Sequence, residues 1–134
     1  MHETILRDFF AGAANAAVLR DDLIGTLTVA EDSLEYDVVK MVEPFRVTPK
    51  HLVRLCEAIM DNSLPPEVLQ PIGLCVIASD HFAWADTATG DLVAETLNDW
   101  ASPETNYPLT PTTVKLFRER LLTGKDVLKT RPLN

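Results

Sequence analysis

Apolar residues spaced three and four positions apart predict amphipathic helices in three parts of the chain. The first is residues 3–22, whose alanine-rich middle has high helix propensity. The second and third begin with the same dipeptide, at Thr48-Pro49 and at Thr110-Pro111. A threonine side chain can cap a helix N-terminus and proline fits the first turn, so we expect helices to begin at both places. The third should end at Gly124.

Four segments have apolar patterns that predict strands. Residues 24–30 and 34–42 are extended segments on either side of a polar turn, which indicates a β-hairpin. Residues 74–86 begin with a continuous apolar run, typical of a strand that is buried on both faces. Residues 91–101 have helical spacing, but the turn before them and their matching length favour a hairpin with the preceding strand. We therefore expect a strand there.

The order of these elements, α-β-β-α-β-β-α, predicts an α+β fold. We expect a mostly antiparallel sheet of about four strands, arranged as two hairpins and packed by about three helices. A chain of 134 residues is expected to form one domain around a single core. We assign residues 1–124 to this globular domain and residues 125–134 to a loosely ordered basic tail.

Charge is distributed unevenly along the chain. The formal net charge is −8, yet residues 55–114 contain nine acidic residues and no lysine or arginine. Residues 115–134 have the opposite balance, with six basic and two acidic residues. The acidic stretch would repel nucleic-acid phosphates and attract a basic protein, so we expect a basic protein partner and no nucleic acid. The basic segment could bind the acidic stretch of its own chain or of a second copy, which would give a homo-oligomer.

Three carboxylates, Asp91, Glu95 and Asp99, are spaced four residues apart. They would share one face in a strand, and also in a helix, where successive members differ by about 40°. Such a row has three interpretations: a solvated face, a protein-binding face, or a site for a divalent cation. The sequence lacks the calcium-binding loop pattern of an EF-hand, and we predict no metal site.

A second candidate surface follows from the strand predicted at residues 74–86. Alternation along it would place Asp80, Phe82, Trp84 and Asp86 on one face. Aromatic residues bracketed by acids either cover the end of the core or form an exposed anchor in an acidic rim, as in protein interfaces. The predicted hairpin would bring Trp100 alongside. The candidate partner-binding residues are Asp80, Trp84, Asp86, Asp91, Glu95, Asp99, Trp100 and Glu104.

An enzymatic alternative depends on His81, which the predicted hairpin would bring near Glu95 or Asp99. His81 and a carboxylate such as Asp80 could form an acid–base pair, or the ring could simply be hydrogen-bonded at the rim. Ser79-Asp80-His81 is not a hydrolase triad, because contiguous residues do not converge and no nucleophile elbow surrounds the serine. The sequence has no glycine-rich phosphate loop, and we predict no cofactor.

The favoured interpretation is a small acidic binding module that presents an anionic, tryptophan-bearing face to a basic protein. An inhibitor, or an immunity protein against a nucleic-acid-processing toxin, would have this size and charge, because its target must be basic to bind phosphate. The alternatives are a small hydrolase-like or metal-assisted enzyme that uses a site formed by His81 and a carboxylate, and a self-associating structural protein. We expect a cytoplasmic protein with no membrane segment, because no apolar run has the length of a span and residues 1–4 do not resemble a signal peptide. The two cysteines, Cys56 and Cys75, lack metal or redox spacing, which fits a reducing compartment.

Overall fold

The computed structural model describes residues 2–23, 43–125 and 127–130, and within these the chain is mainly helical. The helices are α1 (Glu3–Ala11), α3 (Pro49–Met60), α4 (Leu69–Ala78), α5 (Ala88–Ala101), α6 (Pro111–Thr123) and α7 (Val127–Thr130), and the 3-10 helix η1 (Pro66–Val68) precedes α4. Residues 16–23 are helical as well. The strands β1 (Phe45–Arg46) and β2 (Phe82–Ala83) pair in parallel, with Phe45 opposite Phe82.

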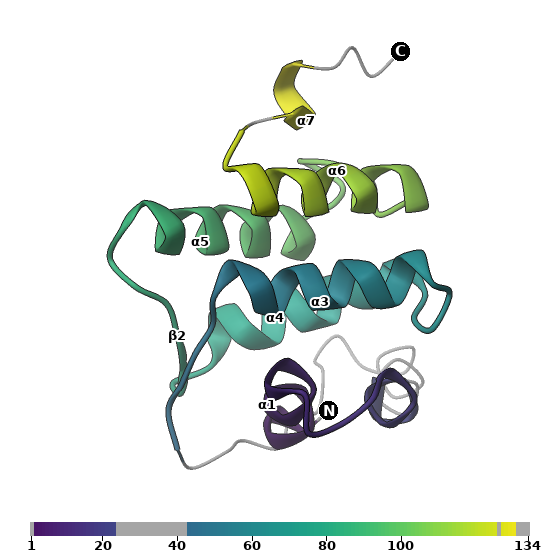
Figure 1. The fold of residues 1–134 in the computed structure, drawn as a ribbon, viewed down its shortest axis with the longest axis vertical. Coiled ribbons are helices and arrows are strands. Elements are labelled where there is room, and N and C mark those ends of the chain that lie inside the picture. Colours follow the sequence, from purple (N-terminus) through teal and green to yellow (C-terminus); the bar gives the residue numbers. More distant parts are fainter. Residues whose placement is uncertain (1, 24–42, 126, 131–134) are drawn as a thin grey trace.

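Two close helix pairs make up most of the fold. α3 packs along α6 and α4 packs along α5, so these helices form one stack (Figure 1). α1 packs on α3 from the opposite side, and α7 follows the end of α6. The β1–β2 pair lies at the end of the stack where α3 begins. The architecture is therefore a helical bundle with a small parallel β link.

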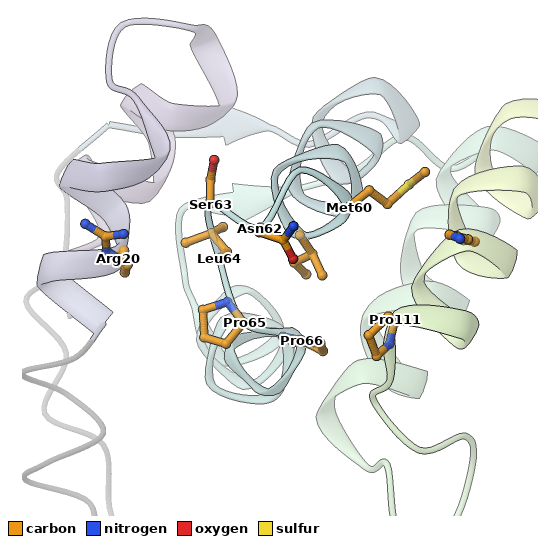
Figure 2. A pocket seen from close by; sticks show the side chains of 10 residues that line it. Arg20, Met60, Asn62, Ser63, Leu64, Pro65, Pro66 and Pro111 are labelled. Atoms are coloured by element: carbon orange, nitrogen blue, oxygen red, sulfur yellow. The ribbon is translucent and has the colours of Figure 1, made fainter.

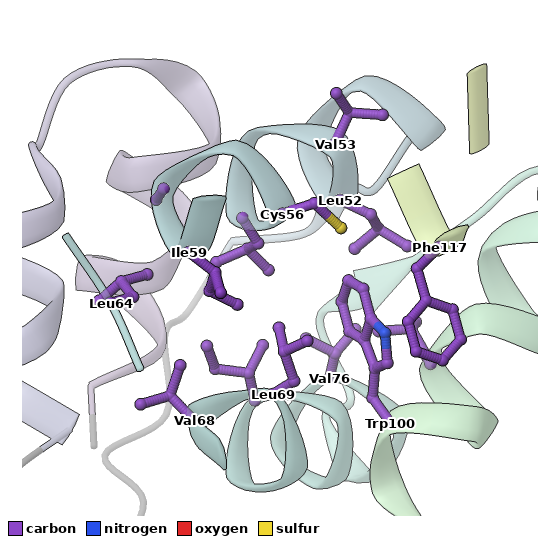
Figure 3. Close-up of a cluster of buried hydrophobic side chains, with 14 of the residues drawn as sticks. Leu52, Val53, Cys56, Ile59, Leu64, Val68, Leu69, Val76, Trp100 and Phe117 are labelled. Atoms are coloured by element: carbon purple, nitrogen blue, oxygen red, sulfur yellow. The ribbon is translucent and has the colours of Figure 1, made fainter. Parts of the chain in front are cut away.

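The core lies between the helices and consists of their inward-facing aliphatic and aromatic side chains (Figure 3). Trp100 and Phe117 are both fully buried, and their ring centroids are 6.0 Å apart with an interplanar angle of 87°. This edge-to-face arrangement is one that aromatic pairs prefer. Leu52 from α3 and Val76 from α4 approach the same region, so residues from the whole stack share one core.

The predicted starts of α3 and α6 are confirmed. Thr48 and Thr110 are the N-caps, and each is followed by proline in the first turn. The cap of α6 is reciprocal: Thr113 N–H donates to Thr110 Oγ1 (3.2 Å), and Thr110 N–H donates to Thr113 Oγ1 (3.0 Å). Gly124 ends α6 in a left-handed conformation (φ 74°), which glycine adopts without steric cost.

The predicted α+β fold with a mostly antiparallel four-stranded sheet is wrong. Residues 74–78, predicted as a buried strand, are the second half of α4, and residues 91–101, predicted as the hairpin partner, belong to α5. A short apolar run does not distinguish a buried strand from a buried helix, and here η1 runs directly into α4. The turn predicted before residue 91 is the start of α5, where Thr87 Oγ1 accepts a hydrogen bond from Gly90 N–H (3.4 Å). Of the predicted second hairpin, only β2 is a strand, and its partner β1 is parallel.

The helix predicted over residues 3–22 is interrupted after α1. Gly12 ends α1 in a left-handed conformation (φ 82°). Asn15 then precedes the helical residues 16–23, and its Oδ1 accepts a hydrogen bond from Val18 N–H (3.1 Å). Two short helices with separate caps therefore replace the single long one.

The two remaining predicted segments are the first hairpin and the C-terminal tail. The hairpin predicted at residues 24–30 and 34–42 lies outside the described residues. Within the predicted tail, residues 127–130 form α7, and Leu128 is buried. None of the helices in the described part of the chain has the length and apolar character required to cross a bilayer.

Candidate functional site

α4 and α5 approach each other closely because Gly73 of α4 has no side chain. A Cβ atom at this position would lie 3.0 Å from the carbonyl oxygen of Leu97 and 3.1 Å from the backbone nitrogen of Ala101, both in α5. Contacts this short are tighter than ordinary packing. The outward faces of the two helices therefore meet along a narrow seam and form one continuous surface.

The outward face of α4 is apolar. Leu74 is 38% exposed and Ile77 is 40% exposed, and Ala78 beside them is exposed too. Ile77 follows Gly73 by one helical turn, so it lies close to the seam with α5. A helix that is apolar on every side is normally buried on every side, and α4 is not. Aliphatic side chains grouped on one exposed helix face are typical of a contact surface.

The outward face of α5 borders this apolar face and is acidic. Asp91, Glu95 and Asn98 are exposed along it, with the smaller Ala94 between them and the seam. We name the exposed side chains of Leu74, Ile77, Ala78, Asp91, Glu95 and Asn98 the α4–α5 surface. Neither of its helices contains a lysine or an arginine.

Two of the three carboxylates in the predicted acidic row contact Arg120 of α6. The buried Arg120 guanidinium donates from Nη2 to Asp99 Oδ2 (2.7 Å) and to Thr96 Oγ1 (3.1 Å). Its Nη1 lies 3.5 Å from Glu95 Oε1. Asp99 is only 9% exposed, whereas the Glu95 side chain is 47% exposed. Asp91, at the start of the row, is therefore exposed to solvent, whereas Asp99, at its end, is in a buried ion pair between α5 and α6. The accessible charge of the row comes from Asp91 and Glu95.

The basic C-terminal segment thus pairs in part with the acidic body of its own chain. Arg118, two residues before Arg120, also makes such a pair, since its Nη2 lies 3.1 Å from Glu57 Oε2 of α3. The Arg118 pair is half-exposed, in contrast to the buried Arg120 pair. Both arginines project from α6 and connect it to the two neighbouring helices.

The two tryptophans lie in different environments. Trp100 is fully buried in the core, while Trp84, just after β2, is half-buried against its edge. Asp80 and Asp86 are exposed on either side of β2, and Glu104 is exposed in the loop after α5. The fold therefore distributes the predicted partner-binding residues over the β2 segment, the face of α5 and the core, and brings only the α5 residues into one row.

His81 lies in the turn between α4 and β2. Asp99, by contrast, is near the far end of α5. At a rise of about 1.5 Å per residue, it lies about 16 Å along the helix axis from Ala88, the first residue of α5. Ser79 Oγ accepts a hydrogen bond from His81 N–H (3.1 Å) and donates one to Glu3 Oε1 (3.2 Å), contacts that brace the turn. His81 Nδ1 is buried without a hydrogen-bond partner in the described part of the chain. His81 is not among the residues that line the clefts beside Pro65, Thr48, Asn15 and Arg118.

The cysteines are placed as inert core residues. Burial raises the pKa of the Cys56 thiol to about 12, and burial also raises the pKa of the Cys75 thiol to about 12. A thiol that stays protonated is a poor nucleophile and a poor metal ligand. In residues 2–23, 43–125 and 127–130, no group of three or more histidine, cysteine, aspartate or glutamate side chains is arranged to hold a metal ion.

Leu74 and Ile77 are the large apolar residues of the α4–α5 surface that sequence reasoning missed. The strand predicted at residues 74–86 assigned both to a buried interior. The signal was nevertheless present, because residues 74, 77 and 78 fall on one side of a helix that begins near residue 69. Recognising that helix would have required choosing between two patterns that a short apolar run fits equally well.

No protein-family model, no curated protein and no solved structure matches this chain.

Proposed function

We propose that this chain is a small protein-binding module whose α4–α5 surface docks a basic, amphipathic segment of another protein. The observation that supports this most is the exposure of Leu74 and Ile77 beside the carboxylates of Asp91 and Glu95, on two helices without a basic residue. Buried apolar side chains supply most of the affinity of such contacts, and complementary charge selects the partner and speeds the encounter. The docked segment would place its apolar side chains on α4 and its lysines or arginines over α5.

A module of this kind fits an inhibitor or an immunity protein that masks a nucleic-acid-binding surface. Such a surface is basic because it neutralises phosphates, and the net charge of −8 favours association with it. The same charge disfavours binding to nucleic acid itself. We place the module in the cytoplasm, where its free thiols, Cys56 and Cys75, would remain reduced.

The proposal is tested with a synthetic helical peptide of leucine and lysine, labelled for fluorescence anisotropy. Two variants remove one component each: Ile77→Ser removes an apolar contact, and Asp91→Lys reverses a charge. Their matched controls are Leu122→Ser and Glu119→Lys, which make the same changes at exposed positions of α6. Each surface variant should weaken binding by about tenfold, as expected for loss of a central interface residue, while the controls leave it unchanged. The charge reversal should also reduce the salt dependence of the association rate.

Three results would contradict the proposal. The first is equal affinity of the surface variants and their controls. The second is peptide binding that maps by NMR to amides outside α4 and α5. The third is a salt-insensitive dimer in sedimentation that Ile77→Ser converts to a monomer, because the apolar face would then be covered by a second copy of the chain. Thermal unfolding of every variant shows whether the fold is retained.

A further inference from the structure

α3 and α6 lie antiparallel, so that the start of each helix meets the end of the other (Figure 1). At one end of the pair, Met60 of α3 and Pro111 of α6 line a common cleft (Figure 2). At the other end, a cleft of about 690 Å³ lies where α3 begins and α6 ends, beside the first turn of α5. The residues of α3 and α6 that line it, which we name the α3–α6 surface, are Pro49, Lys50, Val53, Glu57, Leu121 and Leu122.

The α3–α6 surface contains the most exposed large apolar side chain in the described part of the chain. Leu122 is 56% exposed, whereas Val53 and Leu121 of the same cleft are buried and belong to the core. An exposed leucine at the rim of an apolar cleft is a projection beside a hollow. Such a patch is complementary to itself, because two copies related by a two-fold axis can each place the projection in the hollow of the other.

The charges of the α3–α6 surface are complementary to themselves as well. Lys50 and Glu57 are both exposed, and they line the cleft from the same side of α3, two helical turns or about 10 Å apart. A second α3 crossing antiparallel over the midpoint, near Val53, would place each Lys50 opposite Glu57 of the other copy. Glu57 is positioned for this contact by its own chain, because its Oε2 lies 3.1 Å from Arg118 Nη2.

We propose that the α3–α6 surface binds a second copy of the same chain, in a symmetric dimer with antiparallel α3 helices. Leu122 of each copy enters the apolar cleft of the other, and Lys50 and Glu57 form two symmetry-related ion pairs. The leucine contacts supply the affinity, and the ion pairs set the orientation, since exposed ion pairs contribute little affinity by themselves.

The charge pattern favours a second copy over a partner of uniform charge. A basic segment, such as the one proposed for the α4–α5 surface, would place a cation opposite Lys50, and an acidic segment would place a carboxylate opposite Glu57. The dimer does not depend on the proposed function, because the α3–α6 and α4–α5 surfaces share no residue.

Sedimentation equilibrium over a range of protein concentrations tests the apolar contact. Leu122→Ser should weaken dimerisation at least about tenfold, because two-fold symmetry removes the contact twice. The matched control is Leu74→Ser, which removes an exposed leucine of the α4–α5 surface and should dimerise like wild type. A salt concentration of about 0.15 M screens the general repulsion between two copies of net charge −8.

Two charge reversals test the orientation by complementation. Lys50→Glu alone places carboxylates opposite each other in both contacts, and Glu57→Lys alone places ammonium groups there, so each should weaken its own dimer several-fold. Mixing the two variants restores opposite charges in both contacts, so a heterodimer should form with close to wild-type affinity. The matched controls, Lys115→Glu and Glu104→Lys, reverse exposed charges outside the surface, and they should dimerise like wild type alone and mixed.

Three results would overturn this inference. The first is a protein that stays monomeric at about 1 mM, since the affinity would then be too weak for a specific dimer. The second is a dimer that Leu74→Ser weakens as much as Leu122→Ser does. The third is a mixture of the two charge variants that is no more dimeric than either variant alone, while thermal unfolding shows that both are folded. A missing dimer leaves peptide binding by the α4–α5 surface intact, so the two proposals fail separately.

Discussion

Replacing Arg120 with methionine tests how the acidic face of α5 is held to α6. The guanidinium is almost fully buried, makes hydrogen bonds of 2.7 and 3.1 Å to Asp99 and Thr96, and lies 5.3 Å from the centre of the Phe117 ring. Removing one partner of a buried ion pair typically costs about 3–5 kcal/mol, because the other charge stays in a poorly solvated place. The Asp99 side chain, 12% exposed, is in such a place. We therefore expect Arg120→Met to lower the free energy of unfolding by about 3–5 kcal/mol.

Arg118→Met is the matched control on the same helix. Its ion pair with Glu57 is 3.1 Å long, similar to that of Arg120, but its side chains are 35% and 54% exposed. Exposed pairs contribute about 0–1 kcal/mol, so this variant should be close to wild type. A double variant, Asp99→Leu with Arg120→Met, should recover at least about 1 kcal/mol of the loss, because an apolar pair leaves no buried charge.

Urea unfolding followed by circular dichroism measures all four proteins under one condition. The midpoint should fall strongly for Arg120→Met alone, with an unchanged denaturant slope if the native state stays compact. Equal destabilisation by Arg120→Met and Arg118→Met would refute the reasoning, since burial would then make no difference to the ion pair. A double variant that is less stable than Arg120→Met would refute the charge-burial explanation and favour loss of packing.

Two further predictions concern the helix contacts. Gly73→Ala should lower the free energy of unfolding by about 1–3 kcal/mol in urea titrations, because the added Cβ would press on the backbone of α5. In an open helix the same change would stabilise the protein by about 1 kcal/mol. A variant more stable than wild type would therefore contradict the close α4–α5 contact. Burial lowers the pKa of His51, whose Nδ1 accepts a hydrogen bond from Thr48 N–H (2.9 Å) at the start of α3. The contribution of the neutral His51 ring to the free energy of unfolding should therefore be fully present above the unfolded-state pKa of 6.5. This contribution should decline as the pH falls below 6.5, since the unfolded chain then binds more protons than the folded chain. His51→Gln keeps an acceptor but does not titrate, so its stability should depend less on pH between 6.5 and 5 than that of wild type; parallel profiles would exclude His51 as the source.

Helix ends were predictable because they depend on local chemistry. The Thr-Pro dipeptides at residues 48 and 110 and the glycine at 124 act on the backbone within one turn, and each marks a helix end in the structure. For the first helix, apolar periodicity alone did not locate the helix ends, because Gly12 and Asn15 divide one apolar pattern into two helices. A cap inside an alanine-rich stretch changes the helix boundary without changing the periodicity.

The assignment of residues 74–78 and 91–101 depended on partners far away in the sequence. An apolar run can be a strand if another strand pairs with it, or a helix if helices cover it, and here α5 covers α4 along the contact at Gly73. The candidate site changed with this assignment. Helix geometry buried Trp100 and exposed Leu74 and Ile77, the reverse of what the hairpin predicted for these residues.

The sequence by itself determined the charge of this protein: a central stretch of residues 55–114 without lysine or arginine, followed by a basic segment. Charge belongs to the side chains and does not depend on the fold. The tertiary structure decided which charges remain available, because packing α6 against α5 buries Arg120 beside Asp99 and leaves Asp91 in solvent. An acidic residue contributes charge to a binding surface only where its carboxylate stays exposed to solvent, and that is settled by how the helices pack.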